Sequence, residues 1–228
     1  MLLNEDQGTN QEKIESYTKL PEETLRRAYN LGFDDYSPTE RLWITEYNTR
    51  GKVRYRPALR ETWMHGLLVA AYSLLLMQDE RVEMLLPHQI AGQEALYRTV
   101  ETPRWGGTYG VTTYGEAIRH LFGVMDDHST VQQLTFERKK PSGGESSEEA
   151  ELVVGNVFDS STAVVVNLRD SQMLVRLGSL FEDQDLCYQW MSLSDPLRNG
   201  VEGKDLEREQ GPSAGYLSIP PFSIVTIN

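Results

Sequence analysis

The residues with the clearest chemical potential follow the short apolar run 42–44, where the chain reads Thr45-Glu46-Tyr47-Asn48. A strand that ends in a carboxylate, an aromatic ring and an amide can present an acid to a pocket. In barrels of alternating strands and helices, catalytic groups lie where the strands end. Glu46 is therefore the leading candidate for a catalytic carboxylate, with Tyr47 and Asn48 as ligand-binding groups. The motif taken alone is equally consistent with a strand that ends in a solvated glutamate.

A second group of candidate residues follows the apolar run 81–86. His88 and Gln89 stand directly after this run, and for His88 a pocket role and a structural role are equally open. Trp105 begins a glycine-rich segment that could form an aromatic platform for a sugar or simply a flexible loop. His65 lies within an apolar helical stretch and is predicted to be a core histidine. The four histidines show no metal-ligand spacing, so we expect neither a metal nor another cofactor.

Composition narrows the class of protein. The chain has 228 residues, of which 39% are hydrophobic and 25% charged, so we expect a packed core. Its net charge of −12 argues against nucleic acid and anionic membranes as partners. The single cysteine, Cys187, excludes an intrachain disulfide. No signal peptide is recognisable at the N-terminus, and the apolar stretch 67–77 is too short to span a membrane, so a cytoplasmic location is favoured.

The elements that would position these residues differ between two parts of the chain. Residues 1–20 are polar and are expected to be flexible. In residues 21–128, helical periodicity alternates with apolar runs: a helix begins near Pro21, a strand contains Trp43, a second helix runs from Pro57 to Leu76, and a strand covers 81–86. A further helix is predicted over 114–125. The strand, helix and strand from Trp43 to residue 86 form a βαβ unit.

Residues 129–228 are predicted to form an antiparallel β-sandwich, because short strands recur between turn signals. A solvated linker is expected at 138–150, a hairpin turn at 159–161 and an acidic surface loop at 199–213. The predicted strands cover residues 152–158, 163–168, 173–177, 186–191, 216–219 and 222–227.

A single βαβ unit cannot close a barrel, which needs eight strands. We therefore expect residues 21–128 to be the C-terminal part of a (β/α)8 TIM barrel, an α/β region followed by the all-β sandwich. The apolar faces of the Trp43 strand and of the helix over 67–76 would then lack their barrel partners. They should drive self-association, bind a partner, or pack against the chain's own sandwich.

This order of motifs resembles the retaining α-L-arabinofuranosidases of glycoside hydrolase family fifty-one. The strand-seven motif of that family, Asp-Glu-Trp-Asn, is matched by residues 45–48. The Ala/Leu-rich helix and the strand-eight motif that ends in Gln are matched by 63–77 and 82–90. Later segments follow in the family's order, covering residues 108–121, 166–170 and 219–225. The likeness covers roughly residues 40–228.

The resemblance implies that Glu46 is the nucleophile of a retaining glycosidase and that Gln89 lies near the sugar. Tyr47, Asn48, His88 and Trp105 would then bind the substrate, an arabinose-containing oligo- or polysaccharide. Three positions depart from the family pattern. Thr45 and Tyr47 replace Asp and Trp, and the Asn that follows the strand-eight Gln is replaced near Gly92.

A larger departure concerns the general acid/base. The family places it in an Asn-Glu pair at the end of strand four, and nothing before Glu46 resembles that pair. Retaining hydrolysis needs two carboxyl groups roughly 5–5.5 Å apart. We therefore expect a truncated or split C-terminal piece that is weak or inactive alone, either a homo-oligomer or bound to a chain that supplies the missing strands. The alternative is a non-catalytic carbohydrate-binding or interaction protein derived from such an enzyme.

Overall fold

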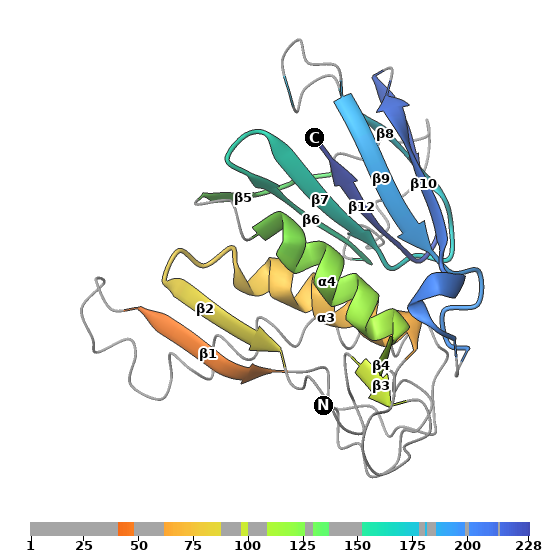
Figure 1. The fold of residues 1–228 in the computed structure, drawn as a ribbon. Helices are drawn as coiled ribbons and strands as arrows, with labels where there is room; N and C mark the ends of the chain where they lie inside the picture. Colours follow the sequence, from red (N-terminus) through yellow and green to blue (C-terminus); the bar gives the residue numbers. More distant parts are fainter. Residues whose placement is uncertain are drawn as a thin grey trace, which may run out of the picture.

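A computed structural model describes residues 41–47, 62–87, 97–99, 109–125, 130–136, 152–177, 181, 186–198, 201–213 and 215–228. These residues form a layered arrangement that is mostly sheet, with two helices (Figure 1). A parallel pair of strands lies on one side of the two helices, and a larger antiparallel sheet lies on the other.

The parallel pair consists of β1 (Leu42–Tyr47) and β2 (Val82–Pro87). Leu42 is paired with Val82 and Ile44 with Leu85. Helix α3 (Trp63–Leu76) connects the two strands in sequence, so the predicted βαβ unit is confirmed. Apolar and β-branched side chains favour the extended backbone of both strands.

Helix α3 is apolar on all sides and is covered on all sides. Thr62 caps its N-terminus by accepting a hydrogen bond from the backbone N–H of His65 at 3.2 Å. Every residue of the helix except Leu75 is buried. One side meets β1, β2 and helix α4 (Thr113–Met125), and the other meets the antiparallel sheet. Of the outcomes foreseen for this helix, packing against the chain's own sheet is the one that the structure shows.

The antiparallel sheet has the strand order β10-β9-β12-β7-β6-β5. One face packs against α3 and α4, and the other packs against apolar residues of the two-stranded β8–β11 sheet. The strands of the large sheet are β5 (Val131–Gln133), β6 (Val153–Phe158), β7 (Thr162–Asn167), β9 (Leu186–Ser192), β10 (Glu207–Ser213) and β12 (Ser223–Ile227). The smaller elements are β8 (Met173–Arg176), β11 (Tyr216–Ile219), the β3–β4 pair (Tyr97–Thr99 and Tyr109–Val111) and the short 3-10 helix η4 (Gly203–Asp205).

Most predicted strands of the C-terminal half lie within one or two residues of the observed ones. The hairpin turn is also confirmed, because Asp159 and Ser160 have φ values of 47° and 56° between β6 and β7. Two positive φ values in succession are typical of the type I′ turns that join antiparallel strands. The expected acidic loop at 199–213 is wrong, since β10 pairs with β9 from Glu207 to Ser213. β10 is charged because it is a sheet edge, where charge discourages pairing with other chains.

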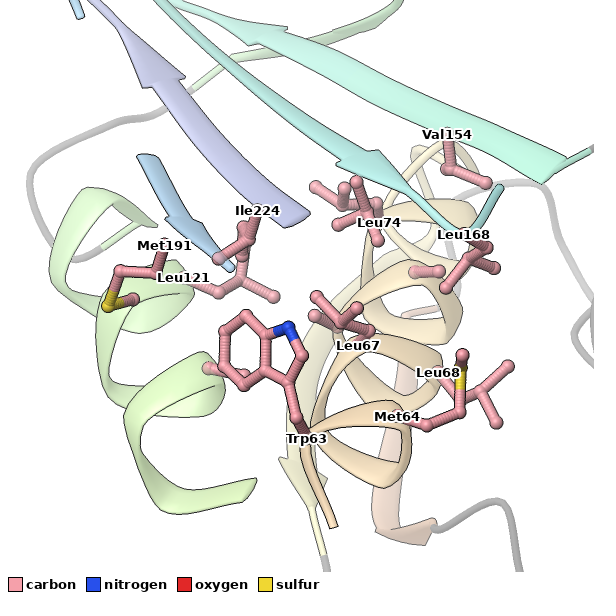
Figure 2. Packing of buried hydrophobic residues seen from close by; sticks show 14 of the residues in the cluster. Trp63, Met64, Leu67, Leu68, Leu74, Leu121, Val154, Leu168, Met191 and Ile224 are labelled. Atoms are coloured by element: carbon pink, nitrogen blue, oxygen red, sulfur yellow. The ribbon is translucent and has the colours of Figure 1, made fainter. Parts of the chain in front are cut away.

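The core between helices and sheet is closed by both apolar packing and hydrogen bonds. Figure 2 shows Trp63 between the two helices, with Leu121 of α4 and Ile224 of β12 beside it. The indole N–H of Trp63 donates to the carbonyl oxygen of Phe222 at 2.6 Å. At the other end of α3, the amide of the fully buried Asn156 donates to the carbonyl oxygen of Leu74 at 2.8 Å. Both bonds join the helical layer to the sheet.

Candidate active site

The candidate site is at the carboxyl ends of β1 and β2. Glu46 is the penultimate residue of β1, and the following residue, Tyr47, is paired with Pro87 at the end of β2. Because the two strands are parallel, the segments that follow them begin at the same edge of the sheet. For Glu46, the structure describes the backbone alone. Asn48, His88, Gln89 and Trp105 lie outside the described residues, and their roles stay predictions.

Tyr47 anchors the end of β1 to helix α3. Its side chain is buried, its ring stacks on Tyr72 with centroids 5.5 Å apart, and its hydroxyl lies 2.6 Å from Oγ of Ser73. Ser73 Oγ donates its only proton to the carbonyl oxygen of Val69 at 2.8 Å, so the Tyr47 hydroxyl must be the donor to Ser73. Burial raises the pKa of Tyr47, so the phenol stays protonated. This positioning role is shown; a contact with ligand stays a prediction.

The two faces of the β1–β2 pair differ in exposure. Ile44, Tyr47 and Leu85 face the helices, whereas Trp43 is 62% exposed and Leu86 is 47% exposed. The Trp43 indole N–H donates to the Glu83 carboxylate at 2.7 Å, which fixes the exposed ring. The exposed side of the pair carries Trp43 and Leu86 together with the polar Thr45 and Glu83, so an apolar exposed face stays a prediction. In a closed barrel, the strand faces directed away from the helices are packed in the interior.

A change of register interrupts β1 just before its end. Leu42 and Tyr47 are both buried. In a regular strand, side chains alternate between the two faces, so residues 42 and 47 would lie on opposite faces. The pairing with β2 is irregular between Ile44 and Tyr47, and this shift restores the buried position of Tyr47. Such bulges occur often next to active sites, where they redirect a side chain. The alternation of the sequence gave no sign of this irregularity.

The two histidines that the structure describes, His65 and His120, lie on helices α3 and α4. His65 is buried and stacks on Tyr114 with ring centroids 4.5 Å apart, as expected for a core histidine. A polar cluster around Glu116, Arg208 and His120 joins α4 to the sheet, and sequence reasoning missed it. Among the described residues, no group of three His, Cys, Asp or Glu side chains could hold a metal ion. None of the helices described has the length and apolar character needed to cross a membrane.

Parts of several solved glycoside hydrolase structures are similar in fold to this chain. The sequence matches no protein-family model and no curated protein. Among solved structures, AbfB, a family 51 α-L-arabinofuranosidase from Bifidobacterium longum, superposes with a TM-score of 0.60 at 11% identity. Another arabinofuranosidase gives 0.57 at 14% identity. BpGH86A, a β-porphyranase of glycoside hydrolase family 86 from the human gut bacterium Bacteroides plebeius, gives 0.51 at 12% identity.

Coverage shows how much of those proteins this chain represents. The superposition with AbfB covers 98% of this chain and 50% of AbfB. For the second arabinofuranosidase the shares are 96% of this chain and 50% of that protein, and for BpGH86A they are 82% and 34%. The chain therefore spans between a third and a half of the length of these structures. At such low sequence identity the likeness shows the fold alone, which is consistent with part of a TIM barrel.

Proposed function

We propose that this chain is the C-terminal portion of a retaining glycoside hydrolase of the arabinofuranosidase type, with Glu46 as its nucleophile. The observation that carries the proposal is the parallel β1–β2 pair, in which Glu46 stands one residue before the end of β1. Carboxyl ends of parallel barrel strands are where catalytic groups of this architecture lie. The likeness to arabinofuranosidase structures supports the same reading.

In this proposal, β1 and β2 correspond to the last two strands of a (β/α)8 barrel, and residues 129–228 form the C-terminal β-sandwich. The support is that helices cover one face of the β1–β2 pair while Trp43 and Leu86 remain exposed on the other. Further barrel strands, on the same polypeptide or on a partner chain, would bury that face. Parallel sheets are almost always covered on both faces. Self-association of the chain would be a second way to cover it.

The proposed chemistry is a double displacement. The Glu46 carboxylate attacks the anomeric carbon, and a second carboxyl group protonates the leaving oxygen and then activates water. Two other acids of this βαβ unit are already engaged, since Glu83 accepts from Trp43 and Asp79 is paired with Arg81 at 3.1 Å. Glu80, the remaining described acid of the unit besides Glu46, lies in the turn before β2, at the opposite end of the strands from Glu46. We therefore infer that the acid/base lies outside the described residues of this unit. Its absence removes a contribution of roughly 10²–10⁴-fold for poor leaving groups.

The test compares substrates with good and poor leaving groups. An activated aryl α-L-arabinofuranoside needs little protonation of its leaving oxygen, so the purified chain should hydrolyse it slowly. It should leave arabinan oligosaccharides essentially intact. Glu46→Gln should abolish the slow activity. Glu83→Gln is the matched control, because it neutralises a glutamate on the adjacent strand and keeps an oxygen that accepts from Trp43. Equal loss in both variants, or none in Glu46→Gln, would contradict the assignment.

One observation favours a second candidate, a carbohydrate-binding protein without catalytic activity. The exposed Trp43 ring is held in place by Glu83, and a fixed exposed ring is suited to stacking against the apolar face of a sugar. For this candidate, titration calorimetry with arabinose oligosaccharides should give binding that Trp43→Ala abolishes, with no release of product from any aryl glycoside. Turnover that depends on Glu46 would decide against it.

A further inference from the structure

Helix α4 is fastened to the antiparallel sheet by a cluster of polar groups separate from the candidate active site. Nε2 of His120 lies 2.6 Å from Oγ1 of Thr226 on β12. Four residues earlier on the same face of the helix, the buried carboxylate of Glu116 is 3.2 Å from Nη2 of Arg208 on β10. Two strands of the sheet therefore hold one face of α4 through side-chain contacts.

The Glu116 carboxylate of this cluster has more than one cationic partner. Its Oε2 also accepts from Nη2 of Arg119 at 2.7 Å, and the Arg208 guanidinium donates to the carbonyl oxygen of Gly203 at 2.9 Å. Gly203 packs so closely that a Cβ there would stand 2.2 Å from Cγ of Glu116. The carboxylate therefore has two guanidinium partners, one on its own helix and one on β10.

Among the described residues, the charged groups that act on the His120 ring are Glu116 and Arg119 on its own helix and Arg208 on β10; Thr226 on β12 carries no charge. The pKa of His120 is lowered to about 4, chiefly by burial; Glu116 acts to raise it, and Arg119 and Arg208 act to lower it. The ring is thus neutral when α4 is seated, because a proton on it would be desolvated.

We propose that the contact of His120 with Thr226, beside the Glu116–Arg208 pair, is an acid-sensitive latch that holds α4 against the sheet and releases it when the ring is protonated. Release would loosen the helical layer that carries β1 and β2. It would leave the β6–β7 hairpin of the sheet in place, since that hairpin is held by its own pairing.

The direction of the pH effect follows from linkage. A histidine whose pKa is lower in the closed state than in the opened state stabilises the closed state. That stabilisation is complete when the pH is above the ordinary histidine pKa of about 6.5, and it is lost as the pH falls toward about 4. If the opened state has the ordinary pKa, the opening constant should rise about 30-fold between pH 7.5 and pH 5. That interval lies mostly above the range in which ordinary carboxylates titrate.

Hydrogen–deuterium exchange of the full chain tests the latch. After correction for the intrinsic exchange rate, amides of α4 (113–125) should lose about 30-fold protection from pH 7.5 to pH 5. Amides of the β6–β7 hairpin (153–167) should lose far less. In His120→Gln, which keeps a hydrogen-bonding side chain but cannot take up a proton, α4 should show no such change. An equal loss in His120→Gln, no loss in the wild type, or an equal loss in the hairpin would each overturn the proposal.

A second measurement keeps the proposal testable if His120→Gln does not fold. The wild-type His120 ring can be followed by NMR between pH 4 and 8 and assigned through its contact with the Thr226 methyl group. A midpoint well below 6.5 is expected, accompanied by loss of that contact as the ring is protonated. A midpoint at or above 6.5, or a contact that survives protonation, would refute the latch.

Discussion

Replacing Gly66 with alanine tests the close approach of the two helices. A Cβ at this position would stand 2.9 Å from Cβ of Ala117 and 3.0 Å from the backbone Cα of Tyr114. These contacts are too short to keep, and one of them is backbone, so the helices must separate slightly. Overpacking of this kind costs roughly 1–3 kcal/mol. Alanine is favoured over glycine in a helix by about 1 kcal/mol, which offsets part of that cost.

The expected net effect of Gly66→Ala is a loss of about 1–2 kcal/mol in the free energy of unfolding. Gly123→Ala is the matched control. Gly123 lies on the exposed side of α4, and a Cβ there meets nothing within 4 Å. The same helix-propensity gain then acts alone, and this variant should be more stable than wild type by roughly 0.5–1 kcal/mol.

Urea unfolding followed by circular dichroism measures the stability of both variants. The change in stability is taken from the urea concentration at the midpoint of unfolding, provided that the dependence of the free energy on urea is the same as in the wild type. The double variant Gly66→Ala/Ala117→Gly removes one of the two clashing methyl groups. The two substitutions should therefore be less destabilising together than the sum of the single effects. If Gly66→Ala is as stable as Gly123→Ala, the helices are not in the contact described, and the packing argument fails.

Three further predictions concern single contacts. Tyr47→Phe removes the hydroxyl that donates to Ser73 and should lower the free energy of unfolding, measured thermally, by about 1 kcal/mol. Ser73→Ala should destabilise the Tyr47→Phe variant less than it destabilises the wild type. Asn156→Ala leaves the Leu74 carbonyl oxygen without this donor inside the core and should cost about 1–3 kcal/mol by urea unfolding; a near-neutral result would contradict the bond. Limited trypsin digestion should spare the bond after Arg208, because β10 is paired along its length; early cleavage there would show that this edge strand opens.

Much of the fold was predictable from the sequence because the relevant signals are local. Alternating apolar residues and turn residues placed β6, β7, β11 and β12 within one or two residues. The apolar periodicity of α3 predicted that it would be covered on more than one side. The parallel pairing of β1 with β2 followed from the helix between them, since a βαβ crossover brings two parallel strands together.

The failures have a common physical cause, since each depends on contacts distant in sequence. Edge strand β10 reads as a loop because it is charged and contains Gly211 and Pro212, and only its pairing with β9 makes it a strand. The short β3–β4 pair was missed for a similar reason. The shift in β1 that buries Tyr47 depends on its pairing with β2 and on Ser73 in α3. The Glu116–Arg208 pair joins residues far apart in sequence, and neither residue type is unusual on a helix or an edge strand.

The most direct test of the central claim is to trap the covalent intermediate on Glu46. A 2-deoxy-2-fluoro arabinofuranoside with an activated leaving group suits this purpose, because the fluorine slows both formation and hydrolysis of the glycosyl–enzyme, whereas the good leaving group speeds its formation alone. Intact-mass spectrometry of the incubated chain, followed by peptide mapping, should show a single glycosyl adduct on Glu46. The adduct should be absent from Glu46→Gln and present in Glu83→Gln. An adduct on another residue, or none at all, would contradict the assignment of Glu46 as the nucleophile of a retaining glycosidase.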